Sequence, residues 1–276
     1  MLLGVTIVLS NDFSEIKKDE RSWQDHQGGD LQTRAYERPG THLVINGQYA
    51  RVAEALQLSS GMRLLDLGCG AGLFLGWLAP RMQAEYHGLD LSFNSLKSIQ
   101  AENSKLGLTV GDAELLPYQE ATFDRISCNG AAHHLLDLRS ALRELYRVLV
   151  PGGILVMYEP TATAVANAVR GAFSIDKYES PADLAHKDEF TRAGVETLLV
   201  EEGFTGISSS FHDFLAYPLS GMYINLPLGR SRSAMKFLTR LESKLERWTI
   251  FKPITDLFAW RLLVVASKPK QPISRS

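Results

Sequence analysis

The sequence predicts an α/β protein in which parallel strands form one sheet with helices on both of its faces. From residue 63 onward, short apolar runs alternate with amphipathic segments, a pattern typical of parallel strands joined by helices. A glycine-rich turn follows the first apolar run in "RLLDLGCGAGLF", residues 63–74. Ligands of such sheets bind beyond the carboxyl ends of the strands, so a cofactor is expected at this turn.

The elements of the core follow in a regular order. A lead-in helix is predicted by the apolar spacing of "THLVINGQYARVAEALQL", residues 41–58. The predicted strands are 63–69, 86–91, 108–112, 123–128 and 154–160. The predicted helices between them are 72–82, 92–105 and 137–149. In the last of these helices the leucines recur on one face, and "PGG" at 151–153 follows as a stop signal.

Two insertions are expected after the core. Residues 161–187 are alanine-rich and then polar, and residues 218–256 begin with a Pro/Gly-rich loop. The remaining predicted elements are helices at 191–204 and 233–248 and strands at 205–219 and 259–269.

The length and composition favour a single domain with insertions. The chain has 276 residues, of which 45% are apolar, enough to bury one sizeable core. We expect a polar leader at 1–40 and a main domain at 41–276, with its cofactor-binding core at 60–160. The opening "MLLGVTIVLS" is interpreted as a short strand or a disordered start. No apolar stretch reaches transmembrane length, so no stable membrane insertion is expected.

Charge and cysteine usage exclude several functions. The formal net charge is −2, with only a mild basic cluster at 229–240, which argues against a nucleic-acid partner. Cys69 and Cys128 are the only cysteines, and neither has partners at metal-ligand spacing, so no metal site or disulfide is expected. This cysteine usage fits a reducing compartment and predicts a cytoplasmic protein.

The spacing of the glycines argues against a dinucleotide site. The pattern is Asp66-x-Gly68-x-Gly70-x-Gly72, and Leu73 stands where the G-x-G-x-x-G fingerprint has its third glycine. A pyrophosphate-binding turn is therefore disfavoured.

A series of motifs instead resembles one known family. "LLDLGCGAG" is similar to the first motif of the class I S-adenosylmethionine-dependent methyltransferases, of the small-molecule, type 11-like branch. The blocks "GLDLS", "GDAELLPYQEATFDRISC" and "ALRELYRVLVPGGILVMYEP" follow in the family's order. The resemblance covers residues 63–160 and implies S-adenosyl-L-methionine as the cofactor. It also implies a Rossmann-like, seven-stranded, mostly parallel sheet whose last strand is antiparallel, with helical lid insertions.

The resemblance assigns a set of residues to the cofactor. Glycines in the turn let the backbone approach a ligand, a carboxylate at Asp90 can accept the ribose hydroxyls, and Asp112 with the Ala113 amide can meet the adenine. Asp66 is placed to order the loop and meet the ammonium group. The residues assigned to the cofactor are Asp66, Gly68, Cys69, Gly70, Gly72, Asp90, Leu91, Asp112, Ala113 and Asn129.

Simpler structural roles stay open for several of these residues. Asp66 could only organise the loop, Asp90 could cap a helix, and Asp112 could be a plain turn residue. Cys69 fits as a small filler of the glycine turn rather than a reactive thiol.

The loop after the fourth strand, "CNGAAHHLLD", is expected to face the methyl group. His134, and less strongly His133, could take a proton from a hydroxyl or an acidic carbon; the alternative is packing on the cofactor or capping the next helix. Glu159, at the end of the fifth strand, is a further candidate base, with a salt bridge or helix cap as its alternative.

Aromatic side chains in the insertions are candidates for acceptor binding. Phe173, Tyr178, Tyr217 and Tyr223 would line a cavity for an apolar or aromatic molecule, or else form the seam between lid and sheet. The helix at 233–248 has an apolar stripe with basic residues on its other faces. This pattern is compatible with a cap over the site, a dimer interface or peripheral contact with a membrane, and packing on the domain is the favoured interpretation.

Together these features predict a methyltransferase that acts on a small acceptor, with oxygen favoured over carbon or nitrogen, in a monomer or homodimer. The alternatives are another transferase on the same cofactor fold and a non-catalytic protein that keeps the cofactor pocket.

Overall fold

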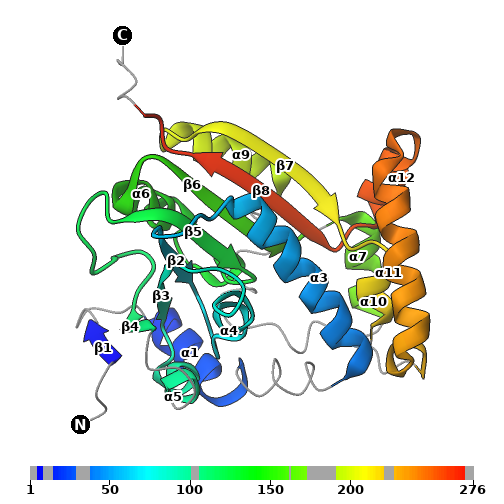
Figure 1. Ribbon diagram of the computed structural model, residues 1–276, viewed down its shortest axis with the longest axis horizontal. Helices are drawn as coiled ribbons and strands as arrows, with labels where there is room; N and C mark the ends of the chain where they lie inside the picture. Colours follow the sequence, from blue (N-terminus) through cyan, green and yellow to red (C-terminus); the bar gives the residue numbers. More distant parts are fainter. Residues whose placement is uncertain are drawn as a thin grey trace.

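The fold is built on one sheet of eight described strands, in the order β1-β4-β3-β2-β5-β6-β8-β7 (Figure 1). The computed structural model describes residues 5–8, 15–28, 38–100, 106–161, 163–172, 191–220 and 227–270. The strands are β1 (Val5–Val8), β2 (Arg63–Leu67), β3 (Glu85–Asp90), β4 (Gly107–Gly111), β5 (Phe123–Asn129), β6 (Leu149–Pro160), β7 (Thr205–His212) and β8 (Arg261–Ser267).

The strand directions confirm the predicted fold class. The pairs from β1 to β6 are parallel, whereas β8 runs antiparallel to both β6 and β7. The predicted sheet of seven strands is therefore present. β1 is an additional strand at its edge, where Val5 pairs with Leu108 of β4, so the first of the two interpretations of the opening segment holds for residues 5–8.

Helices cover both faces of the sheet, as predicted. Their bounds are α1 (Glu15–Trp23), α3 (Pro39–Leu56), α4 (Leu73–Leu78), α5 (Phe93–Gln100), α6 (Leu138–Val148), α7 (Ala164–Ala172), α9 (Arg192–Glu201), α10 (Ala216–Leu219), α11 (Arg232–Arg247) and α12 (Lys252–Phe258). One apolar core packs α6 and α9 against the sheet, and a second packs α3, α4 and α5.

Local sequence explains why α6 forms where it does. Asp137 caps its first turn, because the Ser140 N–H donates to the Asp137 carboxylate over 2.9 Å. Leu142 and Leu145 are buried on its inner face. β6 begins directly after this helix, earlier than the predicted strand, because Leu149 already pairs with Phe123 of β5.

The predicted strand at 205–219 is shorter in the structure. β7 ends at His212 because Asp213 adopts a left-handed backbone with φ 61°, and an extended strand cannot continue through that conformation. Residues 216–219 then form α10.

Two segments predicted from composition are only partly described. Residues 173–187, most of the predicted first insertion, lie outside the described residues, as do 1–4, 9–14 and 29–37 of the predicted leader. The domain boundary near residue 40 stays a prediction. Helix α1 and the π-helical turn η1 (Gln24–Gly28) contact the core through Lys17 and Asp25. None of the described helices combines the length and the apolar character that crossing a membrane requires.

Candidate functional site

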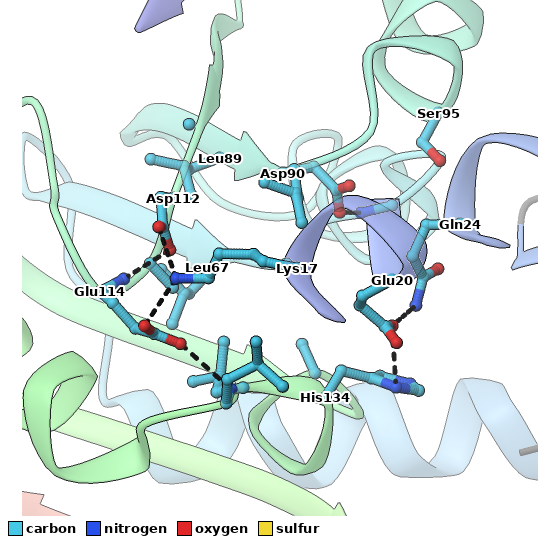
Figure 2. Close-up of a pocket in the computed structure, with 18 of the residues that line it drawn as sticks. Lys17, Glu20, Gln24, Leu67, Leu89, Asp90, Ser95, Asp112, Glu114 and His134 are labelled. Atoms are coloured by element: carbon cyan, nitrogen blue, oxygen red, sulfur yellow. Dashed lines mark hydrogen bonds and ion pairs between the residues drawn. The ribbon is translucent and has the colours of Figure 1, made fainter. Parts of the chain in front are cut away.

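The carboxyl ends of β2, β3, β4 and β5 surround one pocket (Figure 2). Its open space, including the solvent at its mouth, is about 840 Å³. The predicted site residues that line it are Gly68, Gly70, Asp90, Leu91, Asp112, Ala113 and His134. The structure thus brings together residues from four separate motifs.

The glycine turn after β2 is shaped by the protein's own packing as well as by any ligand. Gly68 and Gly72 have φ angles of 65° and 67°, which favour glycine. A Cβ atom at Gly68 would lie 2.2 Å from the Ala131 Cβ, and one at Gly72 would lie 2.6 Å from Ile99. The backbone conformation and the packing of the protein therefore disfavour a side chain at both positions, whether or not a cofactor is bound.

Asp90 connects the glycine turn to the end of β3. Its carboxylate accepts hydrogen bonds from the Gly70 N–H over 2.7 Å and from the Ser92 N–H over 2.9 Å. Burial raises the pKa of Asp90, and these two backbone donors oppose the shift. Each carboxylate oxygen has a second lone pair, so a bound ribose hydroxyl can still be accepted from the pocket.

Asp112, at the end of β4, faces the same pocket from the other side. Lys17 of α1 donates to Asp112 over 2.6 Å and to Glu114 over 2.6 Å. Burial lowers the pKa of Lys17, but the hydrogen bonds to these two carboxylates raise it above its ordinary value. Glu114 also accepts from the N–H groups of Leu136 and Asp137, so it joins the loops after β4 and β5.

Helix α1 covers the pocket, which was not predicted from the sequence. Lys17, Glu20 and Gln24 line the cavity and point into it in Figure 2. Asp25 of η1 continues the contact, because it accepts from the Ser92 hydroxyl over 2.5 Å. The available signal was the spacing of Lys17, Glu20 and Gln24, which places all three on one face of a helix.

The two histidines after β5 have different surroundings. His134 lines the pocket, with its Nδ1 3.4 Å from the Glu20 carboxylate and its ring near Trp23. His133 turns toward the sheet, where its Nδ1 is 2.7 Å from Glu159. The two imidazole rings are adjacent, with their centroids 4.0 Å apart.

Glu159 is 1% exposed and holds the loop after β5, which carries His133 and His134. One of its oxygens accepts from the N–H groups of Ala131 and Ala132, and the other meets His133. Burial raises the pKa of Glu159, but the His133 contact and the two backbone donors bring it below its ordinary value. Glu159 is not among the residues that line the pocket.

Other predicted cofactor residues lie beside the pocket rather than in its lining. Asp66 is 2% exposed and accepts from the Ser127 hydroxyl over 2.7 Å; burial raises the pKa of Asp66 to about 7, and the Ser127 hydrogen bond opposes the shift. Cys69 is buried, and burial raises the pKa of its thiol. Gly72 and Asn129 are also absent from the lining.

The predicted acceptor residues fall in two groups. Phe173, Tyr178 and Tyr223 lie outside the described residues. Tyr217 is 1% exposed, packs in a cluster with Trp260, and its hydroxyl accepts from Arg261 over 2.8 Å. It does not line the described pocket. Across the described ranges, no group of three or more His, Cys, Asp or Glu side chains could hold a metal ion.

The core of the chain matches a known domain family. Residues 65–157 match the family model described as a methyltransferase domain. The methyltransferase GfsG of Streptomyces halstedii is 32% identical over 159 residues, which are 52% of this chain and 56% of that protein. The malonyl-acyl-carrier protein O-methyltransferase of Erwinia pyrifoliae is 38% identical over 106 residues, 37% of this chain and 39% of that protein. The matched part thus spans about half or less of these relatives.

A solved structure shares the fold over most of the chain. The geranyl diphosphate C-methyltransferase of Streptomyces coelicolor, in a complex with Mg²⁺, geranyl-S-thiolodiphosphate and S-adenosyl-L-homocysteine, superposes with a TM-score of 0.66. The match covers 92% of this chain and 98% of that one, at 11% identity. At this identity the similarity concerns the fold.

Proposed function

We propose that the protein is a class I methyltransferase that moves a methyl group from S-adenosyl-L-methionine to a small acceptor, because residues 65–157 match a methyltransferase domain. The observation that carries the proposal is the convergence of Gly70, Asp90, Asp112 and His134, from separate motifs, on one pocket. We further propose that the acceptor is apolar or aromatic and that oxygen is methylated in preference to carbon or nitrogen.

The residues of the pocket fit this cofactor. We assign the Asp90 carboxylate to the ribose and Asp112 with the Ala113 amide to the adenine; all three line the pocket, and Leu89 and Leu91 add apolar lining. When bound, S-adenosylmethionine supplies an activated methyl group on a sulfonium. The protein's contribution is to position the acceptor in line and exclude water, which in favourable models accounts for about 7–11 kcal/mol of the barrier.

His134 supports the preference for oxygen. An acceptor hydroxyl starts protonated, and His134, which lines the pocket, accepts that proton as the oxygen takes the methyl group. The Glu20 carboxylate, 3.4 Å from the imidazole, favours the charged imidazolium that results. Glu159 and His133 hold the loop that carries His134, so we assign them positioning roles.

Binding is the first test of the proposal. Calorimetric titration with S-adenosylmethionine, S-adenosylhomocysteine and NADH is expected to show affinities for the first two of roughly −8 kcal/mol, or micromolar, and none for NADH. Mass spectrometry of copurifying molecules gives an independent readout. Failure of both methionine derivatives to bind would contradict the proposal and favour a non-catalytic protein.

The role of His134 is tested separately. With an acceptor identified from a panel of phenols and quinols, we expect His134→Gln to lower turnover by about 10²–10⁴-fold while the affinity for S-adenosylhomocysteine is retained. His133→Gln, the matched control, should have the smaller effect. Normal turnover of His134→Gln would remove this residue as the base.

A further inference from the structure

The segment 227–258 presents a surface whose exposed charges are all positive. We call the exposed residues of this segment the insertion face; Figure 1 shows α11 at the outer edge of the molecule. Its exposed charged residues are Arg230, Arg232, Lys236, Arg240, Lys244, Arg247 and Lys252. The acidic residues of the same segment are Glu242, Glu246 and Asp256, and none of them is in the exposed class.

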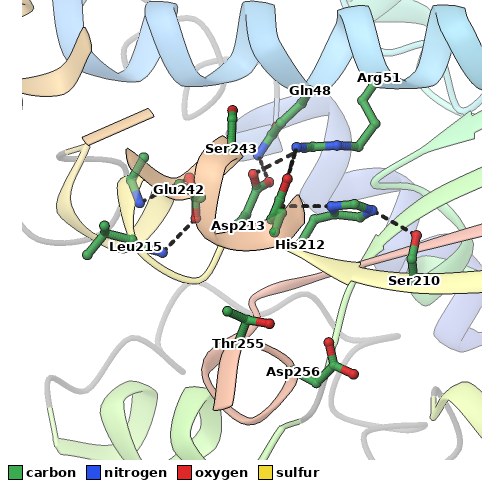
Figure 3. Close-up of polar contacts among 12 residues, drawn as sticks. Gln48, Arg51, Ser210, His212, Asp213, Leu215, Glu242, Ser243, Thr255 and Asp256 are labelled. Carbon is green, nitrogen blue, oxygen red and sulfur yellow. Dashed lines mark hydrogen bonds and ion pairs between the residues drawn. The ribbon is translucent and has the colours of Figure 1, made fainter. Parts of the chain in front are cut away.

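The acidic side chains of α11 contact other parts of the protein, and Figure 3 shows Glu242 beside Leu215. Glu242 is buried and accepts from the Leu215 N–H over 2.7 Å. Glu246 lies 3.1 Å from Arg51 of α3 and 3.0 Å from His212 of β7. These contacts fix the orientation of α11 about its own axis, so its basic residues face the solvent.

Large apolar side chains are exposed on the same face. They are Leu228, Phe237, Trp248, Ile250, Ile254, Leu257 and Phe258, and the exposed fraction reaches 79% at Ile250. Isolated exposed apolar residues are ordinary, but a concentration of them in one segment marks an interaction surface.

The two kinds of side chain lie next to each other along α11. Phe237 and Leu241 are separated by four residues, so they share one stripe of α11, and Trp248 follows directly at the end of the helix. Arg240 and Lys244 border this stripe, and a shallow hollow runs beside them. Lys236, Arg240 and Lys244 form no ion pair within the described part of the chain.

We propose that the insertion face docks on the surface of an anionic phospholipid bilayer. An amphipathic helix with Lys and Arg beside Trp, Phe and Leu lies in the plane of a membrane interface, where apolar side chains enter and cations meet the headgroups. Charge complementarity favours this occupant over a second copy of the chain. In a symmetric dimer the same patch meets itself, which would bring like charges together.

The test is cosedimentation of the full chain with vesicles. The wild-type protein is expected to sediment with vesicles of an equal mixture of phosphatidylcholine and phosphatidylglycerol, and not with pure phosphatidylcholine. The triple variant Lys236→Glu, Arg240→Glu and Lys244→Glu should bind the anionic vesicles roughly a hundredfold or more weakly, since each cation contributes about fivefold.

A matched control distinguishes the effect of this surface from the effect of a change in net charge. Arg81→Glu, Lys97→Glu and Lys270→Glu change the same number of exposed cations on other elements, and this variant is expected to bind like the wild type. Trp248→Ser with Ile250→Ser should weaken vesicle binding without changing the charge. Circular dichroism confirms that each variant is folded.

Three results would overturn the proposal. The wild type could remain in the supernatant with anionic vesicles, the two triple variants could lose binding equally, or light scattering could show that the insertion face forms a dimer that the first triple variant dissociates. None of these readouts depends on methyl transfer, so failure here is distinguishable from failure of the proposed function.

Discussion

Asp66 and Asp90 are two carboxylates at the ends of neighbouring strands, and their surroundings give them different roles. Asp66 is turned toward Ser127 beneath the glycine turn, and burial raises its pKa to about 7. Asp90 is held by two backbone N–H donors and faces the pocket. The geometry therefore favours a structural contact between β2 and β5 for Asp66 and a contact with the cofactor for Asp90.

Replacing Asp90 tests the contact at the residue scale. Asp90→Ala removes an acceptor from the pocket and leaves the Gly70 N–H without its partner. Hydrogen bonds to charged groups contribute about 1.5–3 kcal/mol each, so we expect S-adenosylhomocysteine to bind at least about tenfold more weakly by calorimetry. Asp124→Ala, at a partly buried aspartate of β5 away from the pocket lining, is the comparison. Unchanged affinity of Asp90→Ala would disprove the ribose assignment.

At the scale of elements, polar side chains fix the positions of two helices. α1 is held over the pocket by Lys17, with both of its carboxylate partners on the loop after β4. Glu246 holds α11 against Arg51 of α3 and His212 of β7, and Glu242 holds it against the N–H of Leu215, just before α10. In both cases a few polar contacts decide where an otherwise amphipathic helix lies.

Removing the Lys17 charge should loosen α1. In Lys17→Met the stem is preserved but the contacts with Asp112 and Glu114 are lost, so the helix opens more often. We expect the association and dissociation rates of S-adenosylhomocysteine, measured by stopped flow, to rise severalfold. Lys18→Met, at an exposed position of the same helix, should leave both rates unchanged. Equal rates in all three proteins would show that α1 does not limit exchange.

Glu242 makes the attachment of α11 dependent on pH. Burial, together with the nearby Asp213 and Glu246, raises the pKa of Glu242 to about 8 from the ordinary 4.5. Between these values the folded state binds more protons than the unfolded state, so the free energy of unfolding falls as the pH rises. The loss from this group is at most about 1.4 kcal/mol per pH unit.

Glu242→Gln isolates this contribution. The variant cannot ionise, so its free energy of unfolding, measured by urea titration at several pH values, should fall less than that of the wild type between pH 4.5 and about 8. Asp66 titrates in the same direction in both proteins, so only the difference between the two curves reports on Glu242. Parallel curves would contradict the raised pKa.

For the whole molecule, the pocket lies between an N-terminal helix and the ends of four strands, so a ligand there bridges distant parts of the chain. A ligand that binds only the folded state stabilises it by mass action, by about 2.7 kcal/mol at a hundredfold excess over Kd. For a chain of this size each kcal/mol corresponds to a Tm increase of about 2–4 °C.

We therefore expect S-adenosylhomocysteine to raise the Tm by several degrees in differential scanning fluorimetry. NADH should leave the Tm unchanged, and Asp90→Ala should show a smaller increase at the same ligand concentration. An equal increase in Asp90→Ala and the wild type would place the bound ligand elsewhere on the molecule.

The sequence by itself determined the sheet, the glycine turn, the resemblance to a family and most of the pocket-lining residues at the strand ends. Alternating apolar runs encode strands and helices locally, and motif residues at strand ends meet at one edge of a parallel sheet. For this reason Gly68, Gly70, Asp90, Asp112 and His134 could all be assigned from the sequence to one site, and residues 65–157 match the family model described as a methyltransferase domain.

Only the tertiary structure decided what covers the pocket and which way the side chains turn. Lys17 meets Asp112 across 95 positions of sequence, and Arg51 meets Glu246 across 195. The spacing of Lys17, Glu20 and Gln24 marks one face of a helix but not what that face contacts, so the coverage of the pocket by α1 was not predicted. For Glu159 the sequence left a base and a salt bridge open, and the structure shows the contact with His133. The same holds for α11, because its inward acids and outward cations follow from contacts with α3 and β7 that form only when the chain is folded.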